Sequence, residues 1–182
     1  MTQPPPVSTA AALLNAAAAL AARTGSALAL TVEQVCAEAG ADAQAFSSQF
    51  KDIDEFRQAL MWVGHDAVRG ELIQAVTQQK PGLPRLQLAL VSWCDANLAR
   101  PWLRELAAVY GNTPPNPEKV RSRINGFALM LQLELEALGR SRAGTVAKLL
   151  VGITVEVAVA EYEARKPQPE MRQILLNFLE HT

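Results

Sequence analysis

Nearly every stretch of this chain between one glycine or proline break and the next has the periodicity of an α-helix. Apolar residues recur three or four positions apart, as in Leu131, Leu135 and Leu138. Alanine and leucine supply 31 and 24 of the 182 residues, while aromatic residues make up 5%. Helix formers therefore outweigh strand formers, and the sequence predicts an all-α fold rather than a barrel, a sandwich or a collagen.

Capping signals divide the first forty residues into two helices. The first is expected to open at Ser8 and to close at Gly25. The second begins at Thr31, because the Thr31 hydroxyl and the Gln34 side chain can each bond an exposed backbone amide of that first turn. It ends at Gly40.

A third short helix and a longer one follow. Asp42 can cap the third helix, which places Phe46 and Phe50 four positions apart on one face. Asp52, with Glu55 three residues later, repeats the capping pattern and predicts the start of a long helix.

Proline and glycine breaks separate six helices in the remainder of the chain. Their expected ranges are about 53–79, 86–97, 101–110, 117–139, 141–165 and 170–180. We expect Ser141 to cap the fifth of these. Two stretches, 131–136 and 154–159, alternate like strands, but each lies inside a long segment without a turn signal, so helix is predicted there too.

The three short helices carry a recognisable packing pattern. The residues that form it are Leu13, Leu14, Ala17, Gly25, Thr31, Val32, Val35, Ala39, Gly40, Phe46, Phe50, Asp54 and Glu55. This pattern resembles the amino-terminal helix-turn-helix domain of TetR-family transcriptional regulators. Downstream the resemblance is architectural, since that family typically has six further helices.

The resemblance implies a three-helix head (1–52) followed by a six-helix regulatory and dimerisation bundle (53–182). In that family a homodimer places two recognition helices in successive major grooves of operator DNA. A small molecule bound in the carboxy-terminal bundle changes the separation of these helices. The implied function is ligand-responsive transcriptional regulation, without enzyme activity.

The candidate DNA contacts lie on and around the third helix. They are Thr31, Ala43, Gln44, Ser47, Ser48, Gln49 and Lys51. Ser47 stands where the family usually has Tyr, and Ile53 stands where the family has a phosphate-binding Lys. The loop between Gly25 and Thr31 is also one residue longer than usual.

The charge distribution also argues against strong DNA binding by the head. Residues 1–60 have a net charge of −3, from Arg23, Lys51 and Arg57 against Glu33, Glu38, Asp42, Asp52, Asp54 and Glu55. Cations that neutralise phosphates supply most non-specific affinity for DNA. Two interpretations stay open: a regulator with operator binding, and a ligand-binding or protein-interaction homodimer of the same fold that has lost it.

An apolar, aromatic set in the middle of the chain is a candidate effector site. It comprises Trp93, Asn97, Trp102, Tyr110, Phe127, Met130 and Leu131. Large apolar walls with a few polar groups are typical of small-molecule pockets, although each of these side chains could equally belong to an ordinary core. Few charged residues share these faces, so a small, neutral, apolar effector is expected.

The last two helices have wide apolar faces that predict a homodimer. The candidate interface residues are Val146, Leu150, Ile153, Val157, Ile174 and Phe178. Burial of these faces within the chain's own bundle is the alternative.

Other functions find little support in the sequence. The chain has two histidines, two cysteines and no metal, nucleotide or nucleophile motif, so we expect no catalysis, no metal and no cofactor. The uncharged start lacks the cationic residues of a secretion signal and is too short to span a bilayer. A proline-bearing leader (1–7) and a cytoplasmic protein without membrane contact are therefore predicted.

Overall fold

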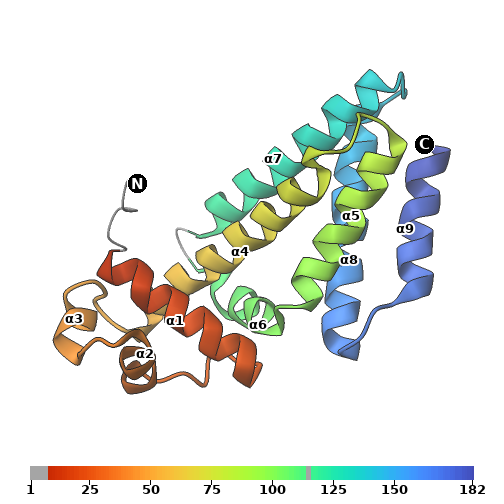
Figure 1. The fold of residues 1–182 in the computed structure, drawn as a ribbon. Helices are drawn as coiled ribbons and strands as arrows, with labels where there is room; N and C mark the ends of the chain where they lie inside the picture. The colour runs from red at the N-terminus through yellow and green to blue at the C-terminus, as the bar shows by residue number, and fades with distance from the viewer. Residues whose placement is uncertain (1–7, 114–115) are drawn as a thin grey trace. The chain divides into compact units, whose positions relative to one another are not determined.

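The computed structural model describes residues 8–113 and 116–182, which fold into nine α-helices without a strand (Figure 1). The helices are α1 (Thr9–Thr24), α2 (Val32–Ala39), α3 (Ala43–Ser47), α4 (Ile53–Thr77), α5 (Leu83–Leu98), α6 (Pro101–Tyr110), α7 (Asn116–Ala137), α8 (Ala143–Ala164) and α9 (Pro169–His181). The predicted all-α fold is confirmed, including helix in both alternating stretches. The predicted leader (1–7) and the break residues Pro114 and Pro115 lie outside the described residues.

The predicted caps of the first two helices are present. The Ser8 side chain accepts a hydrogen bond from the Ala11 amide, and Gly25 ends α1 with φ of 79°. Thr31 and Gln34 form both halves of the capping box at the start of α2. Local side-chain chemistry therefore sets these helix ends.

An aromatic cluster holds α3 against the start of α4. The rings of Phe46, Phe50 and Phe56 are buried, and their centroids lie 5.0–5.5 Å apart. Asp42 caps α3 through the Ala45 amide at 2.7 Å. Such ring pairs add stability beyond the area they bury, so α3 is fixed in orientation although it is only five residues long.

The chain divides into two compact units. The first extends to Asp66 and includes Arg100–Tyr110; the second comprises Ala67–Ala99 and Gly111–Thr182. The sequence placed this boundary at 52/53, but the first unit also takes in the first half of α4 and the whole of α6. The reason is that Phe56 completes the aromatic cluster and α6 is hydrogen-bonded to the loop after α1.

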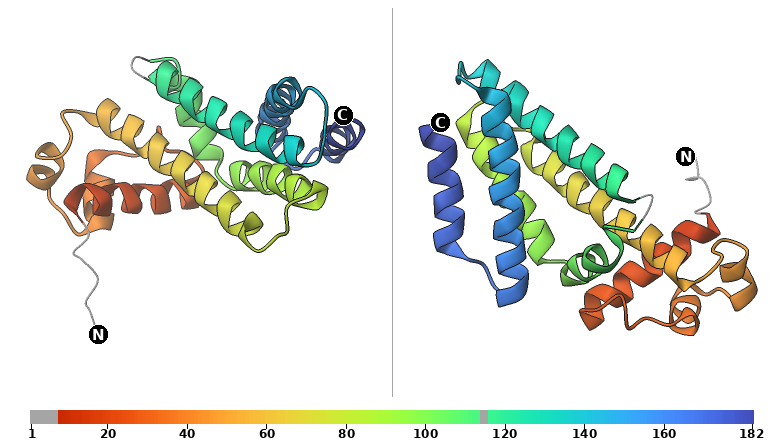
Figure 2. Two further views of the ribbon diagram at one scale, coloured as in Figure 1. Left: turned by 90° about the horizontal axis from the view of Figure 1, so that it is seen from above. Right: turned by 180° about the vertical axis from the view of Figure 1, so that it is seen from behind.

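The second unit is organised around α8. This helix packs against α5, α7 and α9 (Figures 1 and 2) and contributes nine buried residues. Of the helices in the described residues, α8 alone has the length and hydropathy that could cross a membrane, and 39% of its most apolar stretch is buried within the protein.

The predicted cap at Ser141 is wrong. The α7–α8 turn uses positive φ angles at Gly139 (71°) and Arg142 (56°), and α8 begins at Ala143 without a side-chain cap. The turn therefore extends past Ser141, so its hydroxyl is not at the helix terminus.

Candidate functional site

The face of α3 opposite the aromatic cluster is exposed and polar. Ala43, Gln44, Ser47, Ser48 and Gln49 are all exposed, as are Thr31 and Lys51. The seven predicted DNA-contact residues therefore all lie on the surface of the first unit.

The hydroxyl donors of this face are used within α3. The Ser47 hydroxyl donates to the Gln44 carbonyl at 3.1 Å, and the Ser48 hydroxyl donates to the Ala45 carbonyl at 2.8 Å. The Gln49 amide donates to the Ser48 hydroxyl at 3.2 Å. A phosphate would have to replace these bonds, and the net gain from exchanging one neutral hydrogen bond for another is small.

Each of the three cations in residues 1–60 has a partner in its own unit. Arg23 bonds the Glu38 carboxylate at 2.8 Å, and the Lys51 ammonium lies 4.0 Å from Asp52. The Arg57 guanidinium is mostly buried and donates to the backbone carbonyls of the loop between α1 and α2. Arg57 therefore serves to hold that loop.

A carboxylate also occupies the positive end of α2. Glu33 stands in the first turn, and its pKa lies below the ordinary value because its own backbone amide and then the Thr31 hydroxyl bond the ionised form. The partial positive charge of a helix N-terminus attracts anions. Here the protein's own carboxylate fills that role, which leaves less for a phosphate.

Helix α6 is fastened to the head through one carboxylate. Glu105 accepts hydrogen bonds from the Ser26 hydroxyl (2.8 Å), the Ala27 amide (2.8 Å) and the Leu28 amide (3.2 Å). Three donors converge on a single charged group, the arrangement of a strong charge-assisted contact. Glu105 thereby joins α6 to the loop that precedes α2.

Two predicted effector residues belong to the first unit. Trp102 is buried against Gly64, where an added Cβ would lie only 2.8 Å from the indole ring. The indole nitrogen has no hydrogen-bond partner within the described ranges. The Tyr110 hydroxyl donates to Asp54 at 2.7 Å, and burial, followed by this bond, raises the pKa of Tyr110.

The other effector candidates belong to the second unit and do not all share one place. The rings of Trp93 and Phe127 stack at a centroid distance of 6.5 Å, and Leu131 is buried in the same core. The Asn97 amide donates to the Trp93 carbonyl of its own helix at 2.8 Å. Met130 points outward and is 47% exposed, so it does not join the Trp93–Phe127 pair.

One hollow in the second unit lies away from these residues. It has a volume of about 580 Å³, is open to solvent and adjoins the α7–α8 turn. Its lining residues are Gln132, Glu136, Arg140, Arg142, Ala143, Gly144, Thr145 and Lys148. None of the seven predicted effector residues is among them.

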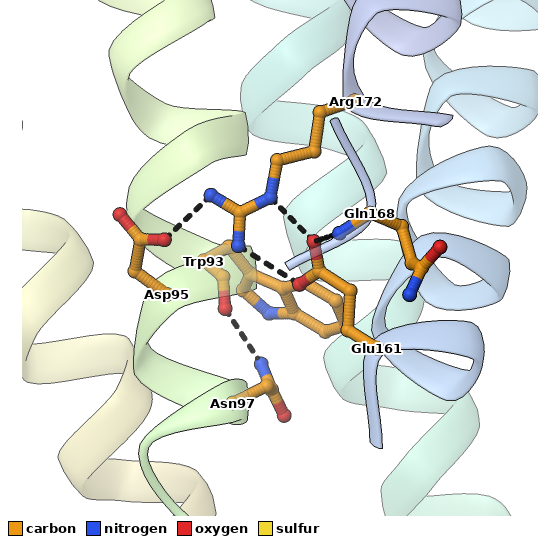
Figure 3. A network of polar contacts seen from close by, with 6 residues as sticks. All are labelled: Trp93, Asp95, Asn97, Glu161, Gln168 and Arg172. Atoms are coloured by element: carbon orange, nitrogen blue, oxygen red, sulfur yellow. Dashed lines mark hydrogen bonds and ion pairs between the residues drawn. The ribbon is translucent and has the colours of Figure 1, made fainter. Parts of the chain in front are cut away.

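A buried ion-pair network ties α9 to α5 and α8 (Figure 3). The Arg172 guanidinium donates to the Glu161 carboxylate at 2.8 Å and to Asp95 at 2.6 Å. The backbone amide of Gln168 donates to Glu161 at 3.0 Å. Burial alone would raise the pKa of Glu161, but Arg172 and then the Gln168 amide outweigh it, and this pKa is lowered.

Half of the predicted dimer residues are covered by their own bundle. Val146, Leu150 and Val157 belong to the buried core of the second unit. Burial within the chain's own bundle is the alternative that the sequence left open. Apolar periodicity shows that a helix face is buried, but it does not show which partner covers that face.

The other predicted dimer residues remain accessible. Ile174 is 62% exposed, and Ile153 and Phe178 lie partly buried at the edge of the core. Leu149 is 52% exposed on the neighbouring surface of α8.

Comparisons with known proteins identify the fold. The structure is similar to the crystal structure of a transcriptional regulator from Rhodococcus sp. Rha1, with a TM-score of 0.75 and 20% sequence identity. The match covers 94% of each chain. This chain has the fold of that regulator. No protein-family model and no curated protein matches its sequence.

Sequence reasoning missed the polar contacts that hold this fold together. Glu105, Arg57 and the Arg172–Asp95 pair each join segments that are distant in sequence, and Glu161 completes the network around Arg172. The one available signal was Glu161 itself, a charged residue at a core position of the α8 periodicity.

Proposed function

We propose that this chain is a ligand-responsive transcriptional regulator of the TetR type that acts as a homodimer. The observation that carries this proposal is the first unit, in which capped helices and three packed phenylalanines present the polar face of α3 to solvent. The likeness to a solved transcriptional regulator over 94% of the chain adds support.

The proposed DNA contact depends on neutral groups. The Gln44, Ser47, Ser48 and Gln49 side chains are of the kind that bond adenine edges and phosphate oxygens. Because the three cations of residues 1–60 are already paired, we expect weak binding that depends little on salt.

The proposed dimer uses the accessible surfaces of α8 and α9. Leu149, Ile153, Ile174 and Phe178 supply apolar area, and an added Cβ at Gly152 would have no neighbour within 4 Å. A second copy can therefore approach α8 closely there. We further propose a cytoplasmic protein without catalytic activity or cofactor, and a small, neutral, apolar effector near Trp93 and Phe127.

A second candidate function is favoured by the electrostatics of the first unit. The same homodimeric fold would serve as a ligand-binding or protein-interaction module without operator binding. The paired cations and the Glu33 carboxylate at the α2 terminus support this alternative.

Selection from a random duplex library at about 20 mM salt distinguishes the two candidates, since phosphate attraction is then least screened. A regulator enriches a pseudo-palindromic sequence whose half-sites lie about one helical turn apart. Absence of any enriched sequence contradicts the regulator and supports the second candidate.

Matched variants test whether the side chains of α3 recognise any enriched DNA sequence. Gln44→Ala with Gln49→Ala should abolish the enrichment, because both side chains are exposed on the proposed reading face. Gln173→Ala on α9 is the control, since this exposed residue bonds only Asn177 among the hydrogen bonds described. Equal loss of enrichment in both variants would show that impaired folding, rather than impaired DNA recognition, causes the effect.

A further inference from the structure

The open hollow beside the α7–α8 turn has an excess of positive charge on its lining. Arg140, Arg142 and Lys148 contribute three cations. Among the described residues, Glu136 is the one carboxylate on this lining. Three cations against one carboxylate give the hollow a formal charge of +2. A concave surface lined by one sign of charge concentrates ions of the opposite sign, so this hollow attracts anions.

The three cations keep their charge available to a ligand. The Arg140 guanidinium donates to the backbone carbonyl of Glu180 at 3.1 Å, which fixes its position without neutralising it. The Glu180 carboxylate is bonded to the Gln87 amide of α5 instead, at 2.7 Å. Arg142 and Lys148 are exposed, and their side chains have no hydrogen-bond or ion-pair partner in residues 8–113 and 116–182.

The carboxylate of the lining has a donor of its own. The Gln132 amide donates to the Glu136 carboxylate at 2.7 Å, one turn along α7. Gln132 also lies against α8, where a Cβ added at Gly144 would be 3.0 Å from its amide oxygen. Gly144 therefore leaves room for the Gln132–Glu136 pair, and Glu136 is held on α7 rather than paired with a cation across the hollow.

The size and charge of the hollow indicate the class of ligand. Its volume of about 580 Å³ is in the range of sites for small organic molecules. Guanidinium groups form bidentate hydrogen bonds with phosphate, and an ammonium binds phosphate as a point charge. A phosphate monoester carries a charge of about −1.5 to −2 at neutral pH, which matches the excess on the lining. A single carboxylate group would leave half of that excess unmatched.

We propose that this hollow is a binding site for a small organic phosphate, with Arg140, Arg142 and Lys148 holding the phosphate group. It is a different site from the one proposed for a neutral effector near Trp93 and Phe127, since neither of those residues lines it. Binding here does not depend on whether the first unit recognises DNA, so the two proposals stand or fall separately.

Titration of the full chain with inorganic phosphate, followed by phosphorus NMR line width at about 20 mM salt, tests the site. We expect saturable binding with a Kd of about 1 mM, which weakens as salt is added because the cations are accessible to solvent. Acetate carries one charge and should not displace phosphate at about tenfold excess. Absence of saturation overturns the proposal, and displacement by acetate overturns the assignment to phosphate.

A matched pair of variants at Thr145 tests the location. Thr145 is exposed on the lining, in the first turn of α8, where a carboxylate is compatible with the helix. Thr145→Glu places a negative charge among the cations and should weaken phosphate binding about fivefold. Thr145→Gln adds a side chain of similar size without the charge and should bind as the wild type does. Equal affinities of the two variants overturn the site.

Removal of two cations supplies an independent test. Arg142→Gln with Lys148→Gln should weaken phosphate binding about tenfold. Lys166→Gln is the control, because Lys166 is an exposed cation outside the lining. Equal losses in the double variant and the control would show that phosphate follows the overall charge of the protein, which overturns the site. Displacement of phosphate by random duplex DNA would make this surface a nucleic-acid contact and overturn the assignment to a small molecule.

Discussion

The two units of this protein differ in what they leave on their surfaces. The first unit uses its charged groups internally: Arg57 and Glu105 bond backbone groups of the loop after α1, and Arg23 pairs with Glu38. The second unit buries an ion network yet leaves apolar side chains uncovered on α7, α8 and α9. The first unit is thus poorly equipped to attract a polyanion, whereas the second has surfaces suited to other proteins.

This difference between the units concerns which of them could supply affinity for DNA and which could supply surface for binding other proteins. A helix-turn-helix head usually contributes cations and thereby affinity for DNA. In this chain the first unit has three short capped helices around a buried aromatic cluster, while exposed apolar area lies on the second unit. Four variants, ordered by expected effect, test each side of the comparison.

The largest effect is expected in the second unit from Glu161→Gln. Removing one partner of a buried, hydrogen-bonded ion pair leaves the other uncompensated and costs about 3 kcal/mol of unfolding free energy. Urea denaturation measures this loss, and Glu163→Gln, an exposed carboxylate on the same helix, should change stability by less than about 0.5 kcal/mol. Equal effects of the two substitutions would show that the network does not hold α9.

Acid titration checks that the Glu161 effect is electrostatic. The pKa of Glu161 is lowered in the folded protein, so its contribution is fully present above the unfolded-state pKa and is lost as pH falls through the folded-state value. The stability gap between the wild type and Glu161→Gln should therefore narrow below about pH 4. A gap that stays constant into acid would point to packing instead.

The second effect concerns the first unit, where Glu105→Gln removes the charge that accepts hydrogen bonds from the Ser26 hydroxyl and the Ala27 and Leu28 amides. Hydrogen bonds to a charged group contribute about 2 kcal/mol, so a loss of that size is expected. Urea denaturation again supplies the measurement, with Glu163→Gln as the control. A loss below about 0.5 kcal/mol would mean that α6 is joined to the head by packing alone.

The third effect concerns the proposed recognition face on α3. Ile53→Lys with Ser47→Tyr restores the two residue types typical of the TetR pattern and should raise affinity for random duplex DNA about tenfold, or 1.4 kcal/mol. Fluorescence anisotropy at low salt measures it. Ile73→Lys, at an exposed position of the second unit, is the control for a general gain of positive charge. A gain equal to that control would show that α3 does not present this face to DNA.

The smallest effect is expected from Asp42→Ala, which removes the cap of α3. Loss of an N-cap costs about 1 kcal/mol, measurable as a shift of the urea midpoint. Ser47→Ala, whose hydroxyl bonds only within the helix, serves for comparison. If both substitutions cost the same, the aromatic cluster rather than the cap fixes α3.

The sequence predicted those parts of the fold that depend on local interactions. The caps at Ser8, Thr31 and Asp42 and the stop at Gly25 involve residues within four positions of one another, and all four are present. The cap at Ser141 failed, because the positive φ of Arg142 extends the preceding turn.

The candidate site was predicted less well, because its geometry depends on distant segments. Periodicity identified the apolar face of α8, but it could not show that Leu150 packs within its own bundle while Leu149 stays exposed. Nor could it place Met130 on the outer side of α7. Contacts such as Arg172 with Asp95 join residues 77 positions apart and leave no local pattern.

The salt dependence of DNA binding tests the central claim most directly, namely that the three cations of residues 1–60 (Arg23, Lys51 and Arg57) are engaged within the protein. We predict that a plot of the logarithm of the DNA-binding constant against the logarithm of the salt concentration has a slope shallower than about −2. This slope is equivalent to neutralising about two phosphates per dimer. A slope of about −5 or steeper, as expected for six or more phosphate contacts, would contradict it, because such a grip needs the cations that the structure shows already paired.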